Sequence, residues 1–360
     1  MDAWKQQEPL ALYTTIKIGG PAEYFVTVPS VENLIACVHE ANTRHQPITI
    51  LGGGSNILVP DAGVRGVVVQ NAITGVSYKE ADDEVFVEVG AGVSWDSLVA
   101  EVVERGLWGI ENLSGIPGSV GGAVVQNINA YGVTLADLIV EVSAVDLTNK
   151  SVTRFTQPEC EFEYRNSFFK RPGAGKEYAV TGVTLKLSKK PIVHSTYRSA
   201  TQSLEQKLKE KGIVEPSPDH VRTEILSIRS NIGMLEGMFN SAGSFFTNPV
   251  ISREAFKRVE AKVVEQYKAV SDAFEPWHWP VGTEQEKISA AFLMECTPYN
   301  KTAFRDKSFN GTVGISPVHT LSIINLGDAS AEDVRQFAEK ISDKVREEFE
   351  IEFRSEVCFL

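Results

Sequence analysis

Two glycine-rich stretches constrain this chain more than any other feature of its sequence. The first is TILGGGSNIL, from Thr49 to Leu58, in which three consecutive glycines follow an apolar run and precede a Ser-Asn pair. The second is ENLSGIPGSVGGAVVQNINAYG, from Glu111 to Gly132, in which five glycines stand among small, hydroxyl-bearing and apolar residues. Glycine allows a backbone to approach another backbone or a ligand closely. The fold must therefore use these stretches as tight turns or as the lining of a ligand site.

The first stretch matches neither standard phosphate-binding motif. A P-loop requires GxxxxGK followed by Ser or Thr, and no lysine follows here; a GxGxxG dinucleotide motif opens a helix, whereas the strand-like ILV follows Asn56. Alone, the stretch is either a tight structural turn or an anion nest, in which successive N–H groups face a phosphate. The second stretch favours an extended, phosphate-bearing cofactor, and a close crossing of packed elements is the alternative.

Composition limits the classes to which the chain can belong. Its 360 residues exceed what one ordinary core organises, so two or three domains are expected. The content of 42% hydrophobic and 23% charged residues is typical of a globular protein. No apolar run approaches about 18 residues, and the N-terminus lacks a secretory signal pattern. We therefore expect a cytoplasmic protein without a membrane partner.

The net charge argues against a nucleic-acid-binding surface, and the distribution of cysteine and histidine argues against a metal site. A net charge of −12 without a Lys/Arg stripe argues against nucleic acid as a partner, whereas an anionic small molecule needs only a few local donors. The six histidines are scattered, and so are the four cysteines, Cys37, Cys160, Cys296 and Cys358. Without a Cys/His cluster, no metal site is expected.

Apolar periodicity and β-branched runs predict helices mixed with strands along the whole chain. Helices are expected at 30–42, 94–106, 252–267 and 330–349, and strands at 47–51, 66–71, 85–92, 139–147, 178–187 and, at the C-terminus, 351–360. Segment 203–230 predicts a short and a longer helix separated by a Pro-rich turn, and we place a domain boundary there. Because strict βαβ alternation is absent, the pattern favours an α+β fold.

Six motifs, taken in order, resemble those of one known family. They are TTIKIGGPAEYFV, ILGGGSNILV, LSGIPGSVGGAVVQNINAYG, YRNSFFK, SAGSFFTNPV and the terminal SEV. Each motif is weak alone, but the combination resembles MurB, the UDP-N-acetylenolpyruvoylglucosamine reductase (UDP-N-acetylmuramate dehydrogenase) family of peptidoglycan synthesis. The resemblance runs from about Thr14 to Glu356, which is nearly the whole chain.

The resemblance implies an architecture and a cofactor. The family binds non-covalent FAD in a vanillyl-alcohol-oxidase/PCMH-type fold of two subdomains, expected here at 1–71 and 72–215. A smaller α+β domain, expected at 216–360 and including the C-terminal Glu segment, covers the substrate. By resemblance, the FAD diphosphate is lined by Gly53, Gly54, Ser55 and Asn56, and the rest of the cofactor by Ser114, Ile116, Pro117, Gly118 and Ser119.

The resemblance also implies a reaction and three catalytic residues. The family uses NADPH as reductant and FAD as carrier to convert the enolpyruvyl ether of UDP-N-acetylglucosamine into UDP-N-acetylmuramate. Arg165 is suited to stabilise charge on the substrate carboxylate, because a guanidinium does not lose its own charge. Ser244 matches the family's proton donor, and Glu356 matches its catalytic carboxylate. Without the resemblance, Arg165 would be interpreted as part of a surface ion pair, Ser244 as a helix-cap or turn residue and Glu356 as a solvated acid.

Four further residues correspond by resemblance to substrate contacts, and two departures stand near the site. The contacts are Tyr131, Tyr197 as a lid tyrosine, Arg229 and Asn248. Where the family has Arg followed by Lys, IRSNIGM has Arg229 followed by Asn231 and Ile232, so we expect Arg229 to compensate in part for the missing lysine. The family ending Glu-Val-Arg is Glu356, Val357 and Cys358 here.

Two other functions stay open from the sequence. The first is another FAD-dependent oxidoreductase of the same fold. Many of those attach flavin to a histidine beside the glycine loop, and no histidine lies between His45 and His194. The second is a vestigial, non-catalytic flavin-binding protein, against which the joint presence of Arg165, Ser244 and Glu356 argues. A monomer acting on a UDP-sugar is expected.

Overall fold

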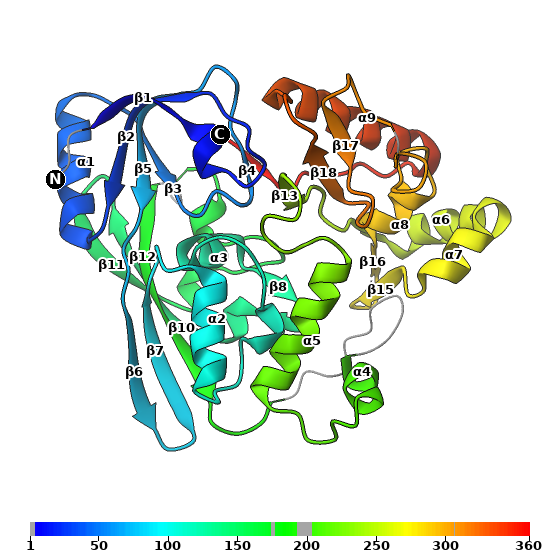
Figure 1. Cartoon of the computed structure of the whole chain (residues 1–360), viewed down its shortest axis with the longest axis horizontal. Coiled ribbons are helices and arrows are strands. Elements are labelled where there is room, and N and C mark those ends of the chain that lie inside the picture. The colour runs from blue at the N-terminus through cyan, green and yellow to red at the C-terminus, as the bar shows by residue number, and fades with distance from the viewer. Residues whose placement is uncertain (1–3, 174–176, 193–203, 306) are drawn as a thin grey trace.

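The computed structural model describes residues 4–173, 177–192, 204–305 and 307–360. Figure 1 shows two sheet-containing units on one side of the molecule and a third unit, from β13 onwards, on the other. Short 3₁₀ helices connect the larger elements, and those that lie wholly in the described ranges are η1 (Leu10–Tyr13), η2 (Glu111–Leu113), η3 (Leu135–Asp137), η4 (Pro158–Cys160) and η5 (Phe168–Lys170). No helix in the described ranges has the length and apolar character needed to cross a membrane.

The first unit is a four-stranded sheet covered by one helix. Its strand order is β1-β2-β5-β3, in which β5 runs parallel to both β2 and β3 and β1 is antiparallel to β2. The elements are β1 (Lys5–Pro9), β2 (Pro21–Val28), α1 (Val31–Thr43), β3 (Ile48–Leu51) and β5 (Val64–Asn71). Ser30 caps α1 by accepting the N–H of Asn33, because the first N–H groups of a helix lack partners within it. The predicted helix is confirmed.

The second unit is a five-stranded antiparallel sheet of order β11-β10-β12-β7-β6. Its elements are β6 (Val76–Ala81), β7 (Glu84–Gly90), α2 (Trp95–Glu104), α3 (Val120–Gln126), β8 (Asn129–Ala130), β9 (Val133–Thr134), β10 (Ile139–Asp146), β11 (Ser151–Thr156) and β12 (Tyr178–Ser188). Trp95 is fully buried in this core, and its indole N–H donates to the Leu113 carbonyl at 3.0 Å. This bond attaches α2 to the second glycine-rich stretch.

The third unit holds two small antiparallel sheets, β13-β18-β17 and β14-β16-β15. Its elements are β13 (Ser241–Ser244), β14 (Val250–Ser252), α6 (Arg253–Gln266), α7 (Lys268–Phe274), β15 (His278–Val281), β16 (Gln285–Ile288), α8 (Ala290–Glu295), β17 (Val313–Ile315), β18 (Ser322–Asn325) and α9 (Ala331–Phe349). Ser330 and Asp333 form the predicted capping box of α9. The apolar face of α9 is buried in the core of this unit.

Two helices connect the second unit to the third. Helices α4 (Leu204–Glu210) and α5 (Pro218–Asn231) are the predicted short and longer helices. Val221 and Ile225 of α5 pack with Trp108, so α5 lies against the second unit. Figure 1 shows α5 between the two sides of the molecule. The domain boundaries expected after residues 71 and 215 stay predictions.

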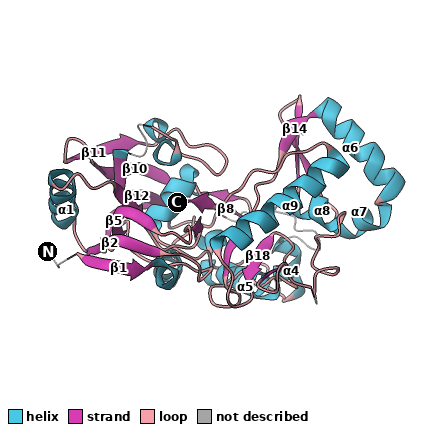
Figure 2. Cartoon of the chain, turned by 90° about the horizontal axis from the view of Figure 1, so that it is seen from above, coloured by secondary structure: helices cyan, strands magenta, loops and turns pink. Residues whose placement is uncertain are grey.

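The C-terminal segment is not the continuous strand predicted at 351–360. Only β19 (Cys358–Phe359) is a strand, paired in parallel with β4 (Ile57–Leu58) at the end of the first glycine-rich stretch. Upstream of it, Ser355 forms a bridge with Phe246. The segment changes partners between these points and therefore cannot form one ladder. Figure 1 shows the C-terminal strand crossing from the third unit to the other side of the molecule, where it ends beside β4. Figure 2 shows the same two sides of the molecule from above.

Candidate active site

The two glycine-rich stretches lie against each other. The hydroxyl of Ser55 donates to the Pro117 carbonyl at 3.0 Å. A Cβ atom on Gly53 would lie 2.6 Å from the Cα of Gly118, which is shorter than real Cβ contacts. Glycine at position 53 is therefore required for the stretches to touch.

Replacing Gly53 by alanine should force the stretches apart. We expect Gly53→Ala to lower the free energy of unfolding by about 1–3 kcal/mol, as overpacking commonly does, and to weaken flavin retention. Gly122→Ala is the control for stability, because its Cβ would meet only the Ser119 hydroxyl, at 3.6 Å, within a helix. Thermal unfolding and the flavin absorbance of the purified variants measure both effects. A Gly53→Ala protein as stable as the wild type would contradict the close packing.

Main-chain N–H groups of both stretches are left without acceptors. Within the described residues, no hydrogen bond is donated by the N–H groups of Gly53, Gly54, Ser55, Asn56, Ile116, Gly118 and Ser119. Successive N–H groups gathered on two touching loops are suited to bind an anionic ligand. These loops therefore fit the diphosphate of FAD without a cationic side chain.

The rest of the second stretch is anchored inside the protein. Ser114 is fully buried, and its hydroxyl donates to the Glu111 carbonyl at 2.6 Å, so its predicted cofactor contact stays untested. The N–H of Gly115 donates to Oδ1 of Asp96 at 2.6 Å, and the carbonyl of Gly115 accepts from Nε of Arg229 at 3.1 Å. Asp96 lies in α2 and Arg229 in α5, so two helices support this loop.

Arg229 lies against the second glycine-rich stretch, and two main-chain carbonyls already accept hydrogen bonds from its guanidinium. It is 7% exposed, and its Nη2 donates to the Met234 carbonyl at 2.8 Å. Burial lowers the pKa of Arg229, and the neighbouring Tyr131 opposes that shift. Tyr131 thus lies beside Arg229, as two predicted substrate contacts should. Tyr197, the predicted lid, lies outside the described residues.

Asp96 should make stability depend on acid pH. Burial alone would raise the pKa of Asp96, but hydrogen bonds from Arg222 and from the Gly115 N–H outweigh burial and hold that pKa below its usual 3.8. A carboxyl of this kind contributes stability above its unfolded-state pKa and loses it as the pH falls through its folded-state pKa. We expect Asp96→Asn to cost about 2 kcal/mol at pH 7 and to flatten the loss of stability below pH 3.8.

Urea unfolding at pH 7 and at pH 3 measures that effect. The control is Glu104→Gln in the same helix, because Glu104 is exposed and such surface charges contribute little. If Asp96→Asn and Glu104→Gln had the same pH dependence, the Asp96 carboxylate would not stabilise the fold.

Main-chain hydrogen bonds bring Glu356 next to the strand that carries Ser244. Ser244 ends β13, and the N–H of Glu356 donates to the carbonyl of the following residue, Phe245, at 2.8 Å. On the other side, the side-chain amide of Asn56 donates to the Glu356 carbonyl at 3.1 Å. Glu356 therefore lies between the first glycine-rich stretch and the Ser244 strand.

Arg165 reaches Glu356 from the second unit. Its Nε lies 2.9 Å from Oε1 of Glu356, and the two side chains are 21% and 13% exposed. The N–H at Nε is not aimed at this oxygen, and no other described residue accepts it. The guanidinium is thus held beside the Glu356 carboxylate by opposite charge.

Lys287, which the sequence reasoning missed, adds a second cation near Arg165. Its Nζ lies 5.4 Å from the ring centroid of Tyr164, and Cζ of Arg165 lies 5.7 Å from the same centroid. Burial, followed by the Arg165 charge, lowers the pKa of Lys287. Asn248 follows Ser244 by four residues, and its Oδ1 accepts the Ala290 N–H at the start of α8, at 2.9 Å. Among the described residues, none accepts from its amide nitrogen.

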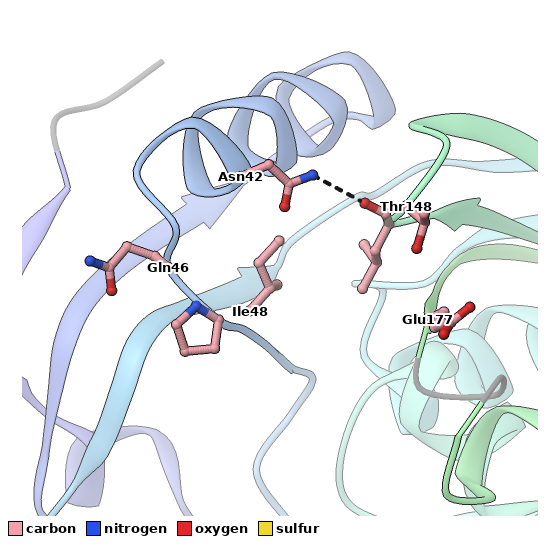
Figure 3. A pocket seen from close by; sticks show the side chains of 7 residues that line it. Asn42, Gln46, Ile48, Thr148 and Glu177 are labelled. Atoms are coloured by element: carbon pink, nitrogen blue, oxygen red, sulfur yellow. Dashed lines mark hydrogen bonds between the residues drawn. The ribbon is translucent and has the colours of Figure 1, made fainter.

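A surface hollow elsewhere takes no part in this site. It measures about 340 Å³ and lies between the end of α1 and the turn that follows β10. Figure 3 shows Asn42, Ile48 and Glu177 around it, and Asn42 donates to the Leu147 carbonyl at 3.5 Å. None of the predicted site residues lines it.

Comparisons with known proteins bear on this site. The model of the FAD binding domain family matches residues 22–155, and that of the UDP-N-acetylenolpyruvoylglucosamine reductase C-terminal domain matches residues 235–360. The chain is 38% identical to the UDP-N-acetylenolpyruvoylglucosamine reductase of Thermobifida fusca, over 95% of this chain and 94% of that protein. It is 36% identical to the protein of the same name from Streptomyces avermitilis, over 95% and 91%.

A solved structure agrees with these matches. The crystal structure of UDP-N-acetylenolpyruvylglucosamine reductase (MurB) from Thermus caldophilus is similar over 99% of both chains, with 25% identity and a TM-score of 0.64. The expected α+β fold with a vanillyl-alcohol-oxidase/PCMH-type FAD-binding unit is confirmed, and FAD is the cofactor. The chain belongs to the UDP-N-acetylenolpyruvoylglucosamine reductase family of flavin-dependent oxidoreductases.

Proposed function

We propose that this chain catalyses the NADPH-dependent reduction of the enolpyruvyl ether of UDP-N-acetylglucosamine to UDP-N-acetylmuramate, in peptidoglycan precursor synthesis. One observation carries the proposal: segments far apart in sequence bring Arg165, Glu356 and the Ser244 strand together, next to the loops with unpaired N–H groups. FAD bound at these loops supplies hydride received from NADPH. The family membership supports the same reaction.

Arg165 is proposed to hold the substrate carboxylate. When hydride adds to the terminal vinyl carbon, negative charge develops on the adjacent carbon and spreads into that carboxylate. A cation fixed in place before the reaction stabilises such charge without reorganising. Glu356, 2.9 Å from Nε, keeps the guanidinium in position. The substrate carboxylate and Glu356 then share Arg165, or one of them is protonated.

Ser244 is proposed to donate the proton that completes the reduction. An unassisted serine hydroxyl is a weak acid, so the site must stabilise its alkoxide or resupply its proton. The half-buried position of Ser244, one residue before the carbonyl that binds the Glu356 N–H, supports this role. The proton would be delivered beside the carboxylate end of the substrate.

Nucleotide binding is proposed to involve Tyr131, Arg229, Asn248 and Tyr197. Because Arg229 already serves two main-chain carbonyls, it replaces the missing lysine only in part. Lys287 is positioned to supply further positive charge on the substrate side, since it lies near Arg165 and Tyr164. Action as a monomer in the cytoplasm, without nucleic acid, stays a prediction.

Product analysis tests this function. The protein is incubated with NADPH and the enolpyruvyl nucleotide, and the nucleotide product is identified by mass. The proposal predicts a gain of two hydrogens per NADPH consumed. Consumption of NADPH that depends on oxygen, with the nucleotide unchanged, would instead support a different oxidoreductase of the same fold.

A further inference from the structure

A chain of side-chain hydrogen bonds connects Lys170 to the catalytic carboxylate. The Lys170 ammonium donates to Oε1 of Gln126 at 2.7 Å, and the Gln126 amide nitrogen faces Oε1 of Glu356 at 3.4 Å. Lys170 also donates to the Arg165 carbonyl at 3.0 Å. One ammonium group is thus attached to the backbone of Arg165 and, through Gln126, to Glu356.

The ammonium determines which way the Gln126 amide points. Lysine has three donors and no acceptor, so the amide atom 2.7 Å from Nζ must be the oxygen. The NH₂ group of Gln126 must then face Glu356. Gln126 is 8% exposed, so water has little access with which to satisfy the opposite orientation.

This orientation distinguishes the two oxygens of Glu356. Oε1 accepts from the Gln126 amide nitrogen at 3.4 Å, and Nε of Arg165 lies 2.9 Å from the same oxygen with its N–H aimed elsewhere. In the described part of the chain, nothing donates a hydrogen bond to Oε2. Of the two oxygens, Oε2 is therefore the one left to contact a substrate group.

Lys170 also supports an unusual backbone conformation. Arg165 has φ of +56°, in the left-handed region that side-chain-bearing residues seldom adopt. The bond from Lys170 to the Arg165 carbonyl closes this turn. The direction in which the guanidinium leaves the backbone is fixed as a result.

We propose that Lys170 is a positioning residue for the reductase reaction, acting through Gln126 to keep Oε1 of Glu356 as an acceptor and to leave Oε2 turned to the substrate. This inference rests on the proposed function. The role proposed for Lys170 can be distinguished from a purely structural one, because the neighbouring Ser167 joins the same two segments without a hydrogen bond to the side chain of Gln126 or Glu356. The Ser167 hydroxyl donates to the Val125 carbonyl at 2.7 Å.

The test compares Lys170→Met, Lys170→Arg, Gln126→Leu, the double variant Lys170→Met/Gln126→Leu, and the control Ser167→Ala. Each holoenzyme is followed by anaerobic stopped flow, first for flavin reduction by NADPH and then for reoxidation by the enolpyruvyl nucleotide. Flavin content and thermal unfolding report folding separately.

We expect Lys170→Met to slow reoxidation by about 100-fold, the order expected when a catalytic group is misplaced by about 1 Å, with flavin reduction unchanged. Lys170→Arg should recover most of the rate, because it restores a donor-only cation. In the double variant, adding Lys170→Met to Gln126→Leu should slow reoxidation by much less than the roughly 100-fold expected in the wild type. The reason is that the free-energy effects of two residues that act through one another do not add.

Three results would overturn the inference. The first is a reoxidation rate of Lys170→Met equal to that of Ser167→Ala. The second is a double variant in which the effects of the two single substitutions multiply. The third is an equal loss of rate in flavin reduction and in reoxidation for Lys170→Met. Should Lys170→Met fail to fold, the comparison of Gln126→Leu with Ser167→Ala decides between the same alternatives. If wild-type flavin is not reoxidised by the nucleotide, the proposed function itself fails and this inference fails with it.

Discussion

Replacing Ser244 by alanine is expected to leave flavin reduction by NADPH near normal and to slow reoxidation by the enolpyruvyl nucleotide by about 10²- to 10⁴-fold, the usual contribution of a positioned proton donor. Flavin reduction by NADPH needs no proton from Ser244. Reoxidation is completed only when the adjacent carbon takes up its proton, because without that proton the charged intermediate returns its hydride. The two half-reactions, measured separately and anaerobically, should therefore respond differently.

Ser241→Ala is the matched control for this variant. Ser241 lies on the same strand and is also half-buried, and its hydroxyl accepts only the Gly243 N–H, at 3.4 Å, among the described residues. It should change neither half-reaction. If Ser244→Ala reduced both half-reactions equally, Ser244 would have a structural role instead of a catalytic one.

Replacing Arg165 by lysine is expected to reduce kcat by about 10²- to 10³-fold, as loss of one preorganised charge-stabilising donor does. Lysine keeps the charge but loses the planar fork that binds a carboxylate through two parallel hydrogen bonds. Its ammonium would also pair with Glu356 at a different point from Nε. Because the lost interaction is strongest in the transition state, kcat should fall more than substrate affinity.

Arg171→Lys provides the comparison for the arginine variant. Arg171 lies in the same segment but pairs with Glu161 and Glu163 at the surface, where such pairs contribute about 0–1 kcal/mol. Turnover should be unchanged in this variant. Unchanged turnover in Arg165→Lys as well would remove Arg165 from the mechanism.

The elements best predicted from sequence are those defined by local signals. Helices α1 and α9 begin directly after their capping residues, Ser30 and Ser330, because a cap hydroxyl and an apolar face lie within one segment. The prediction of one continuous C-terminal strand was wrong, because the residues with which this segment pairs are remote in the sequence. Ser355 bridges Phe246, whereas Cys358 bonds to Asn56, and no local pattern specifies that change.

The parts of the site that lie within a recognisable sequence motif could be predicted. The contacts that form only when remote segments fold together could not. The glycine motifs indicated a cofactor, and the structure shows why: their N–H groups gather on two touching loops. Gln126 and Lys170 stand within quoted motifs, but Gln126 meets Glu356 across 230 residues, and Lys170 reaches that carboxylate only through Gln126. Lys287 has no sequence signal, and the burial of Arg229 follows from the packing of α5.

The most direct test of the central claim is the visible spectrum of the purified protein during an anaerobic titration. The account predicts a yellow protein whose colour bleaches with NADPH and returns on addition of the enolpyruvyl nucleotide, without oxygen. Colour that returns only with oxygen would contradict the assigned reaction. A colourless protein unable to take up FAD would contradict the assignment of the two glycine-rich loops as the cofactor site.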